Sequence, residues 1–95
     1  MPFKIVFASK ARTDIQDAID WENSRADKLG ERFLEYLYKK LAALSVTPLI
    51  GSIHNDKIRY TTTEVFQYLI YYKVDEQARI VIIWRILHVR RKPVE

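Results

Sequence analysis

The spacing of apolar residues changes from helical in the first half of the chain to alternating in the second. A short segment places Phe3, Ile5 and Phe7 on one face, and two segments with apolar residues every three or four positions follow it. Beyond Pro48 and Gly51, apolar and polar residues alternate. A period near 3.6 is typical of amphipathic helices and a period of two is typical of strands. The pattern therefore predicts one strand, two helices and then three strands.

The two helical segments are expected to form a hairpin. Ser9 suits the N-cap of the first helix, which should end near Arg25. Asp27 suits the cap of the second helix, predicted over residues 28–45. Because their connection is short, the helices should pack antiparallel and present an apolar surface that needs a cover. Residues expected on that surface are Ile15, Ile19, Phe33, Leu37 and Leu41.

The second half predicts strands over residues 57–62, 66–74 and 78–89. The middle strand would place Phe66, Tyr68, Ile70, Tyr72 and Val74 on one face. The last strand is apolar on both faces over residues 80–83, as expected of a central strand. Short connections indicate an antiparallel meander, and the first strand must join it to satisfy its backbone. We expect a single α+β domain over residues 1–95, two-layered, with the helices on one face of the sheet.

The composition excludes several kinds of chemistry. The chain has no cysteine, which removes disulfides and cysteine metal sites and agrees with a reducing cytoplasm. We expect no secretory leader, and the longest apolar stretch, residues 80–84, falls far short of the roughly 20 residues of a membrane span. His54 and His88 lack the spacing of metal ligands, and no glycine-rich phosphate loop is present. We therefore expect a cytoplasmic protein without metal or cofactor.

The net charge of +4 is concentrated in the C-terminal part. Residues 57–95 contain eight basic and four acidic side chains, whereas residues 1–56 contain eight of each. In the run from residue 84 to 92, alternation predicts Trp84, His88 and Arg90 on one side and Arg85, Leu87 and Arg91 on the other, with Arg59, Tyr71 and Lys73 added to the second set. Such side chains suit phosphates and bases, or the carboxylates of an acidic protein. A solvated strand end is the third reading, and the residues alone leave all three open.

Four segments, in order, match a known family. Residues 11–21 resemble its opening helix, residues 29–34 (LGERFL) its LGxRF motif, residues 66–75 (FQYLIYYKVD) its FPYxIxYxVD strand, and residues 86–93 (ILHVRRKP) its LHxxRxP ending. Pro48 also stands where a proline usually follows the second helix. The chain thus resembles the ParE/RelE superfamily of toxins from type II toxin–antitoxin systems, most closely its ParE-like, plasmid-stabilisation branch.

This resemblance implies a growth-arresting toxin held inactive by a cognate antitoxin in a hetero-oligomer. The antitoxin would bind the hairpin through Ile15, Ile19, Phe33, Leu37 and Leu41. ParE toxins act on DNA gyrase, and RelE toxins cut messenger RNA in the ribosome. The RelE branch carries an arginine where this chain has Leu69, and a tyrosine in the tail, which is absent from residues 92–95.

The two missing side chains favour a binding inhibitor of gyrase over an enzyme. Its target-binding surface would comprise Arg59, Arg85, His88, Arg90 and Arg91. The alternative is a ribosome-dependent endoribonuclease, with His88 as acid or base and Arg59 and Arg90 holding the phosphate. A degenerate family member without toxicity, or an unrelated binding module of the same topology, completes the set of hypotheses.

Overall fold

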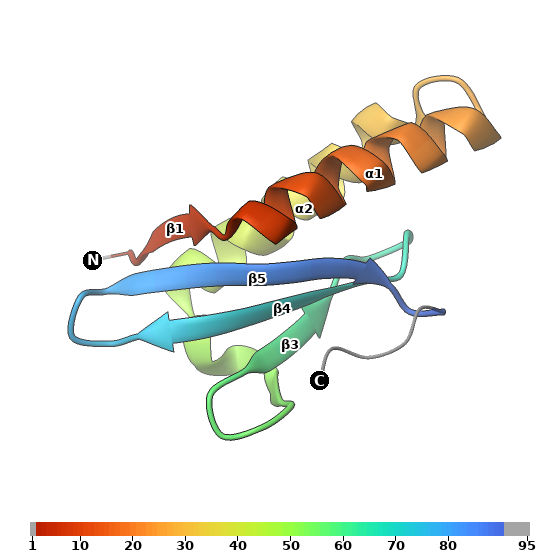
Figure 1. Cartoon of the computed structure of the whole chain (residues 1–95). Helices are drawn as coiled ribbons and strands as arrows, with labels where there is room; N and C mark the ends of the chain where they lie inside the picture. The colour runs from red at the N-terminus through yellow and green to blue at the C-terminus, as the bar shows by residue number, and fades with distance from the viewer. Residues whose placement is uncertain (1, 91–95) are drawn as a thin grey trace.

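The computed structural model describes residues 2–90, which form a five-stranded sheet with a helical hairpin on one face (Figure 1). The elements in chain order are β1 (Lys4–Phe7), α1 (Ser9–Arg25), α2 (Leu29–Val46), the 3-10 helix η1 (Pro48–Ile50), β2 (Ser52–Ile53), β3 (Arg59–Thr62), β4 (Tyr68–Asp75) and β5 (Ile80–His88). The predicted α+β class, with both helices on one face of the sheet, is confirmed.

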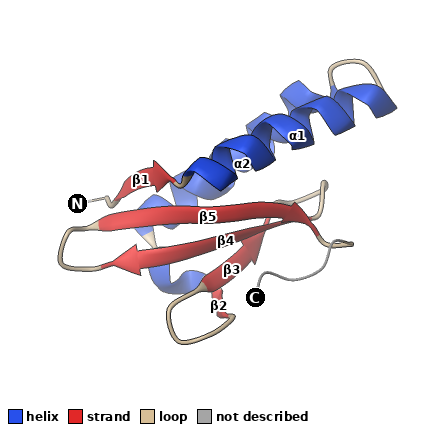
Figure 2. Cartoon of the chain, in the orientation of Figure 1, coloured by secondary structure: helices blue, strands red, loops and turns tan. Residues whose placement is uncertain are grey.

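The strand order in the sheet is β1-β5-β4-β3-β2 (Figure 2). Strands β3, β4 and β5 form the predicted antiparallel meander. Strand β1 joins beside β5 in parallel, with Lys4 opposite Ile80. Strand β5 is therefore bonded on both sides, which explains why its first half is apolar on both faces. The two-residue β2 pairs with β3 and was not predicted, because two residues carry no measurable period.

Both predicted helix caps are wrong, although the helices lie where expected. Ser9 is the first helical residue of α1, and the N-cap position is Ala8, whose side chain makes no capping hydrogen bond. The residue before α2 is Lys28, in the left-handed conformation with φ of 66°. Only a few residues separate the helices, so the chain reverses through this conformation, and Asp27 stands one residue too early to cap.

The hairpin is held closely together near its turn by Gly30. Its backbone N–H donates to the Asn23 side-chain oxygen at 2.8 Å. A Cβ atom at residue 30 would lie 2.8 Å from the backbone oxygen of Ile19 on α1. The glycine in the second position of α2 therefore permits the close approach of two helices, at some cost in helix propensity.

The main core lies between the hairpin and the sheet. Phe33, Leu37 and Leu44 of α2 are fully buried there. From β4 it receives the predicted alternate residues, including Ile70 and Tyr72, which are also fully buried. Burial of each such side chain stabilises the fold by roughly 1.5–3 kcal/mol. The helix stripe predicted from the sequence is thus largely the core of the domain.

A bulge in β5 changes the side on which its later residues lie. Tyr71 of β4 pairs with Arg85 and Tyr72 pairs with Ile83, so Trp84 has no partner on β4. One extra residue reverses the alternation beyond it. Trp84 packs with a second cluster built on Ile58, Tyr71 and Leu87, away from the helices, whereas His88 contacts Tyr68 of the main core. The prediction that Trp84 and His88 share a side is therefore wrong.

Candidate functional site

Arg59 is half-buried and donates hydrogen bonds to the segment that follows the helical hairpin. Its Nη1 atom donates to the backbone oxygens of Leu49 and Gly51, at 3.2 and 3.0 Å. These carbonyls lie in and just after η1, which links the hairpin to the sheet. The guanidinium group of Arg59 was predicted to bind a target or a phosphate. One of its nitrogen atoms instead donates hydrogen bonds within the fold.

Tyr72 completes this attachment of η1. Its buried hydroxyl donates to the Pro48 carbonyl at 2.8 Å and accepts from the Gly51 N–H at 2.9 Å. A Cβ atom at residue 51 would collide with this hydroxyl, which explains the glycine. Burial raises the pKa of Tyr72, and the hydrogen bond from Gly51 and the charge of Arg59 partly oppose that rise.

Arg85 is joined to the first helix. Its Nε and Nη2 atoms donate to the Asp14 carboxylate at 2.7 and 3.0 Å, and the Ile86 N–H donates to the same carboxylate at 3.0 Å. The hydrogen bond to Asp14 raises the pKa of Arg85, and burial opposes this. Only 5% of the Asp14 side chain is exposed. Arg85 was predicted to bind a target, but the donors that define this pair face α1.

His88 and Arg90 lie together at the end of β5. The His88 ring stands edge-on to Tyr68, with centroids 5.2 Å apart, and its Nδ1 atom accepts from the Arg90 N–H at 3.3 Å. Tyr68 in turn donates its hydroxyl proton to Glu22 at 3.0 Å. Glu22 is 1% exposed and also accepts from Arg25 at 3.0 Å. Hydrogen bonds and one ring contact, between Tyr68 and His88, therefore connect α1 to the end of β5.

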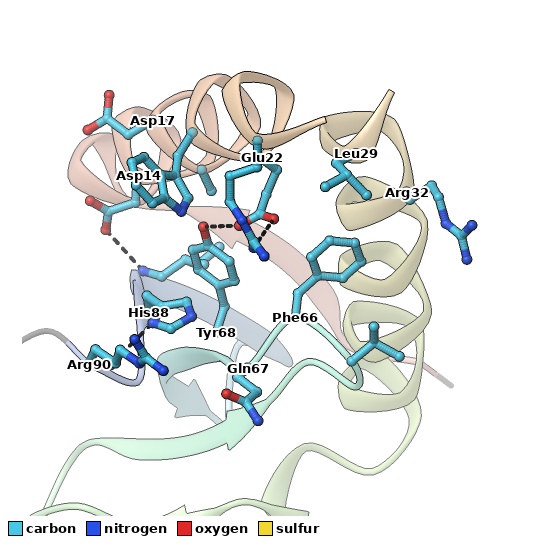
Figure 3. Close-up of a pocket in the computed structure, with 15 residues that line it drawn as sticks. Asp14, Asp17, Glu22, Leu29, Arg32, Phe66, Gln67, Tyr68, His88 and Arg90 are labelled. Atoms are coloured by element: carbon cyan, nitrogen blue, oxygen red, sulfur yellow. Dashed lines mark hydrogen bonds and ion pairs between the residues drawn. The ribbon is translucent and has the colours of Figure 1, made fainter. Parts of the chain in front are cut away.

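These residues line a groove beneath the turn-proximal half of the hairpin (Figure 3). Its walls are α1, the start of α2, the turn between β3 and β4, and the end of β5. In the figure Tyr68 lies between Glu22 and His88, Phe66 lies on the other side of Tyr68 below Leu29, and Arg90 stands beside His88. The lining of the groove includes Asp17, Trp21, Glu22, Arg25, Arg32 and Val65.

None of the residues in that last list was predicted as part of a site. One signal was present, because Glu22 follows the helical spacing of an otherwise apolar stripe of α1. An acidic residue at an inward position indicates a buried partner, here Tyr68. Trp21, Arg32 and Val65 carry no such signal, because only the tertiary fold places them beside one another.

The three residues assigned to RNA cleavage do not meet in one place. Arg59 of β3 is paired with Tyr72 of β4, and His88 of β5 is paired with Tyr68 of β4. Tyr72 and Tyr68 are four residues apart along β4, a distance of about 13 Å. In addition, β4 lies between β3 and β5. Leu69 packs with the outer apolar cluster around Tyr71 and Leu87. Arg91 lies outside the described residues.

The apolar hairpin residues predicted to bind an antitoxin face inward. Phe33 and Leu37 are fully buried, and Leu41 is 5% exposed. Ile15 and Ile19 are partly buried and pack against the same core. In this conformation the five side chains stabilise the domain, and a partner could reach Phe33 or Leu37 only by opening it.

The family model for the ParE toxin of the type II toxin–antitoxin system parDE matches residues 5–93. The chain belongs to this family. A ParE-family protein is the toxin component of a type II toxin–antitoxin system, and its partner is a cognate antitoxin. No curated protein matches the sequence.

Solved structures show the fold that this ParE-family chain shares with other toxins. A chain of the chromosomal ParDE system of P. aeruginosa is 15% identical with a TM-score of 0.79, over 93% of this chain and 97% of that chain. The isolated E. coli RelE toxin is 18% identical with a TM-score of 0.72, over 95% and 87%. A chain of the RelBE2 complex of Mycobacterium tuberculosis is 20% identical with a TM-score of 0.64, over 93% and 99%.

Residues 2–90 of this ParE-family chain contain neither a membrane-spanning helix nor a cluster of metal ligands. Neither α1 nor α2, the long helices within residues 2–90, is long and apolar enough to cross a membrane. Over the same residues, His, Asp and Glu side chains form no group of three that could hold a metal ion.

Proposed function

We propose that this ParE-family toxin arrests growth by binding DNA gyrase in the cytoplasm, and that it does not cleave RNA. The observation that carries the proposal is the separation of the side chains that cleavage would need. Arg59 of β3 is bonded to the carbonyls of Leu49 and Gly51, and His88 of β5 lies on the far side of β4, about four residues further along that strand. A general acid or base must lie within hydrogen-bonding reach of the group that it serves.

The outer face at Leu69 supports the same conclusion. Leucine replaces the arginine that the RelE branch carries, and it packs with Leu87 and Tyr71. An apolar side chain at this place gives no hydrogen bond to a phosphorane oxygen, which is the interaction that stabilises such a transition state. The set expected of a ribosome-dependent nuclease is thus incomplete.

The target-binding surface is proposed at the end of β5. Arg90 is exposed there and His88 is half-buried beside it. Arg59 and Arg85 act through the fold, because their guanidinium groups hold η1 and α1. Arg91 is kept as a proposed contact with the target because it follows Arg90 in the sequence.

A supercoiling assay with purified gyrase tests the proposal. Toxin added in stoichiometric amounts should block supercoiling, and an in vitro translation reaction with the same toxin should retain intact messenger RNA. Arg90→Ala should weaken the block, whereas the matched change Arg12→Ala, at an exposed arginine on α1 outside the groove, should not. Growth arrest in cells with unaffected gyrase activity would sink the proposal.

Ribosome-dependent RNA cleavage is the second candidate, favoured by one observation. The outer face of the sheet gathers aromatic rings, with Tyr60 and Tyr71 6.1 Å apart and Lys73 stacked 4.6 Å from the ring of Trp84. Aromatic and cationic side chains of this kind can stack on bases. Transcript cleavage that is lost in His88→Ala and Arg90→Ala would favour this candidate over gyrase binding.

A further inference from the structure

Three exposed aliphatic side chains lie close together where the helical hairpin passes into the sheet. Leu49 and Ile50 belong to η1 and are 49% and 69% exposed, and Ile53 of β2 is 66% exposed. We call these three residues the η1 patch. Leu49 and Ile53 also line one groove, so they lie on one surface of the molecule. Contiguous apolar surface on a soluble domain is often a place where another molecule binds.

The backbone under the η1 patch is fixed, although the side chains of the patch lie outside the core. The Tyr72 hydroxyl is hydrogen-bonded to main-chain groups on both sides of Leu49 and Ile50, and Arg59 donates to two carbonyls of the same segment. Internal packing does not account for these exposed side chains. Apolar side chains that are already held in place offer a partner a preformed contact, which lowers the entropic cost of binding.

The groove beside the η1 patch carries charges of both signs. Among the described residues, three acidic and three basic side chains line it, namely Asp56, Asp75, Glu76, Lys57, Arg59 and Lys73. This balance differs from the chain as a whole, whose net charge is +4. A balanced surface gives no net attraction to a nucleic acid or to a strongly charged protein. It suits a partner with the same mixture of charges, and a second copy of the chain has that mixture.

We propose that two copies of this toxin form a twofold-symmetric dimer through the η1 patch. Both copies use the same surface in such a dimer, so the surface must be complementary to itself. The aliphatic side chains of the two patches meet, and the acids of one groove face the bases of the other. Strand β2 lies in this contact, at the edge of the sheet (Figure 2). Because β2 is so short, side chains carry the contact and backbone pairing adds little.

The size of the η1 patch sets the strength of the dimer. Stable protein–protein interfaces bury about 1,200–2,000 Å² in total, and smaller ones belong to transient complexes. Three aliphatic side chains with a charged surround fall at the small end of this range. We therefore expect a dimer that forms and dissociates at micromolar concentrations of toxin.

The dimer leaves the proposed gyrase-binding surface free. Arg59, beside the η1 patch, is paired with Tyr72 of β4, whereas His88 is paired with Tyr68, about 13 Å further along that strand. Each dimer therefore presents two copies of the surface formed by His88 and Arg90. This consequence rests on the proposed function, whereas the dimer itself does not.

Sedimentation velocity of the purified toxin, without gyrase or antitoxin, tests the proposal. Over the micromolar range the wild type should shift from monomer to dimer. Ile50→Lys should weaken this association by roughly tenfold or more, and it should melt as the wild type does because residue 50 is exposed. The matched control is Val65→Lys, at a 71% exposed aliphatic residue between β3 and β4, and it should dimerise normally. A wild type that stays monomeric or assembles beyond a dimer would overturn the proposal, as would equal weakening in both variants.

Cross-linking tests the symmetry of the contact. The chain contains no cysteine, so an introduced cysteine is its only thiol. Residues close to a twofold axis meet their own copies, and a disulfide requires two Cα atoms within about 7 Å. Under mild oxidation Ile50→Cys or Ile53→Cys should therefore form a disulfide-linked dimer faster than Val65→Cys does. If neither variant is faster than Val65→Cys, the two copies do not meet at η1 and the proposal fails.

A charge reversal tests the complementarity of the grooves. Lys57→Glu leaves acids facing acids across the axis, so it should weaken the dimer at low salt and less at high salt. Arg12→Glu makes the same change of charge at an exposed residue of α1 outside this groove, and it should dimerise normally. Equal effects of the two reversals would mean that total charge governs association, which contradicts a self-complementary surface. Because no gyrase is present, all three tests are independent of the gyrase proposal.

Discussion

Asp14 on α1 receives three hydrogen bonds from two consecutive residues of β5, and so joins a helix to a strand 71 residues further along the chain. The donors are the Arg85 guanidinium and the Ile86 backbone N–H. Both follow Trp84, the residue without a partner on β4. The carboxylate thus satisfies polar groups at the place where the bulge interrupts regular strand pairing.

Asp14→Ala should be among the most destabilising single changes in the chain. It leaves the Arg85 charge and a buried N–H without their acceptor, and such a loss costs about 3–5 kcal/mol. Urea denaturation measures the free energy of unfolding. Asp17→Ala, an exposed acid on the same helix, serves as the control and should change that energy by less than about 0.5 kcal/mol. Equal losses for both variants would remove the role assigned to Asp14.

Tyr72 predicts a loss of stability in alkaline solution. Burial raises its pKa in the folded protein, so the unfolded chain releases this proton first as pH rises past about 10. The unfolded state then binds fewer protons than the native state, and the free energy of unfolding falls with rising pH. At neutral pH the shift has no effect, because both states are protonated.

Tyr72→Phe should make the alkaline loss shallower. The variant should also be less stable at neutral pH by about 1–3 kcal/mol, because the Pro48 carbonyl and Gly51 N–H lose a buried partner. Unfolding curves between neutral and strongly alkaline pH provide the measurement. Tyr38→Phe, at a 60% exposed tyrosine, should follow the wild-type profile.

Arg59→Ala should loosen the link between hairpin and sheet. The change removes a charged donor from the Leu49 and Gly51 carbonyls, worth about 1.5–3 kcal/mol. Hydrogen exchange should accelerate first at residues 48–53. Lys57→Ala, an exposed lysine before β3, is the control. Unchanged stability in Arg59→Ala would mean that its guanidinium is available to a target after all.

Gly30→Ala should destabilise the protein even though alanine favours helices. The added methyl group would lie 2.8 Å from the Ile19 carbonyl oxygen, so the two helices must separate. Overpacking of this kind costs about 1–3 kcal/mol. Thermal unfolding measures the effect, and Glu35→Ala on the exposed face of α2 gives the reference. A gain in stability would contradict the close approach.

Arg90→Ala should leave the fold intact and weaken inhibition of gyrase. Its side chain is exposed, so the free energy of unfolding should change by less than about 0.5 kcal/mol. A lost charge contact at the edge of an interface reduces the association rate most strongly at low salt. Inhibition curves at two salt concentrations give the measurement. If the variant inhibits as well as wild type under both conditions, the target surface lies elsewhere.

The arrangement of helices and strands could be predicted because both apolar periods are long and regular. The stripe containing Phe33 and Leu37 identified α2, and the alternation of Ile70 and Tyr72 identified the inner face of β4. The cap residues were predicted wrongly. Ser9 and Asp27 have suitable side chains, but each stands one position away from the N-cap of its helix. Local preference was outweighed there by the geometry of the turn.

The candidate site could not be predicted in the same way. Trp84 looks like any strand residue in the sequence, yet the bulge at this residue reverses the alternation beyond it, so that Trp84 lies on the outer face while His88 lies beside Tyr68 of the main core. Arginines were predicted as one basic surface because charge is visible in a sequence and its partner is not. Asp14 lies 71 residues before Arg85, and nothing local links them.

The pairing of β1 with β5 has a consequence for how the toxin is made. The first strand of the chain finds its place only beside the last one, Lys4 against Ile80. A growing chain that has left the ribosome up to β4 therefore holds a hairpin and a partial sheet that still lacks β5, the strand between β1 and β4. Non-local pairing of this kind comes late in folding. Synthesis itself thus delays completion of the sheet until β5 has been made.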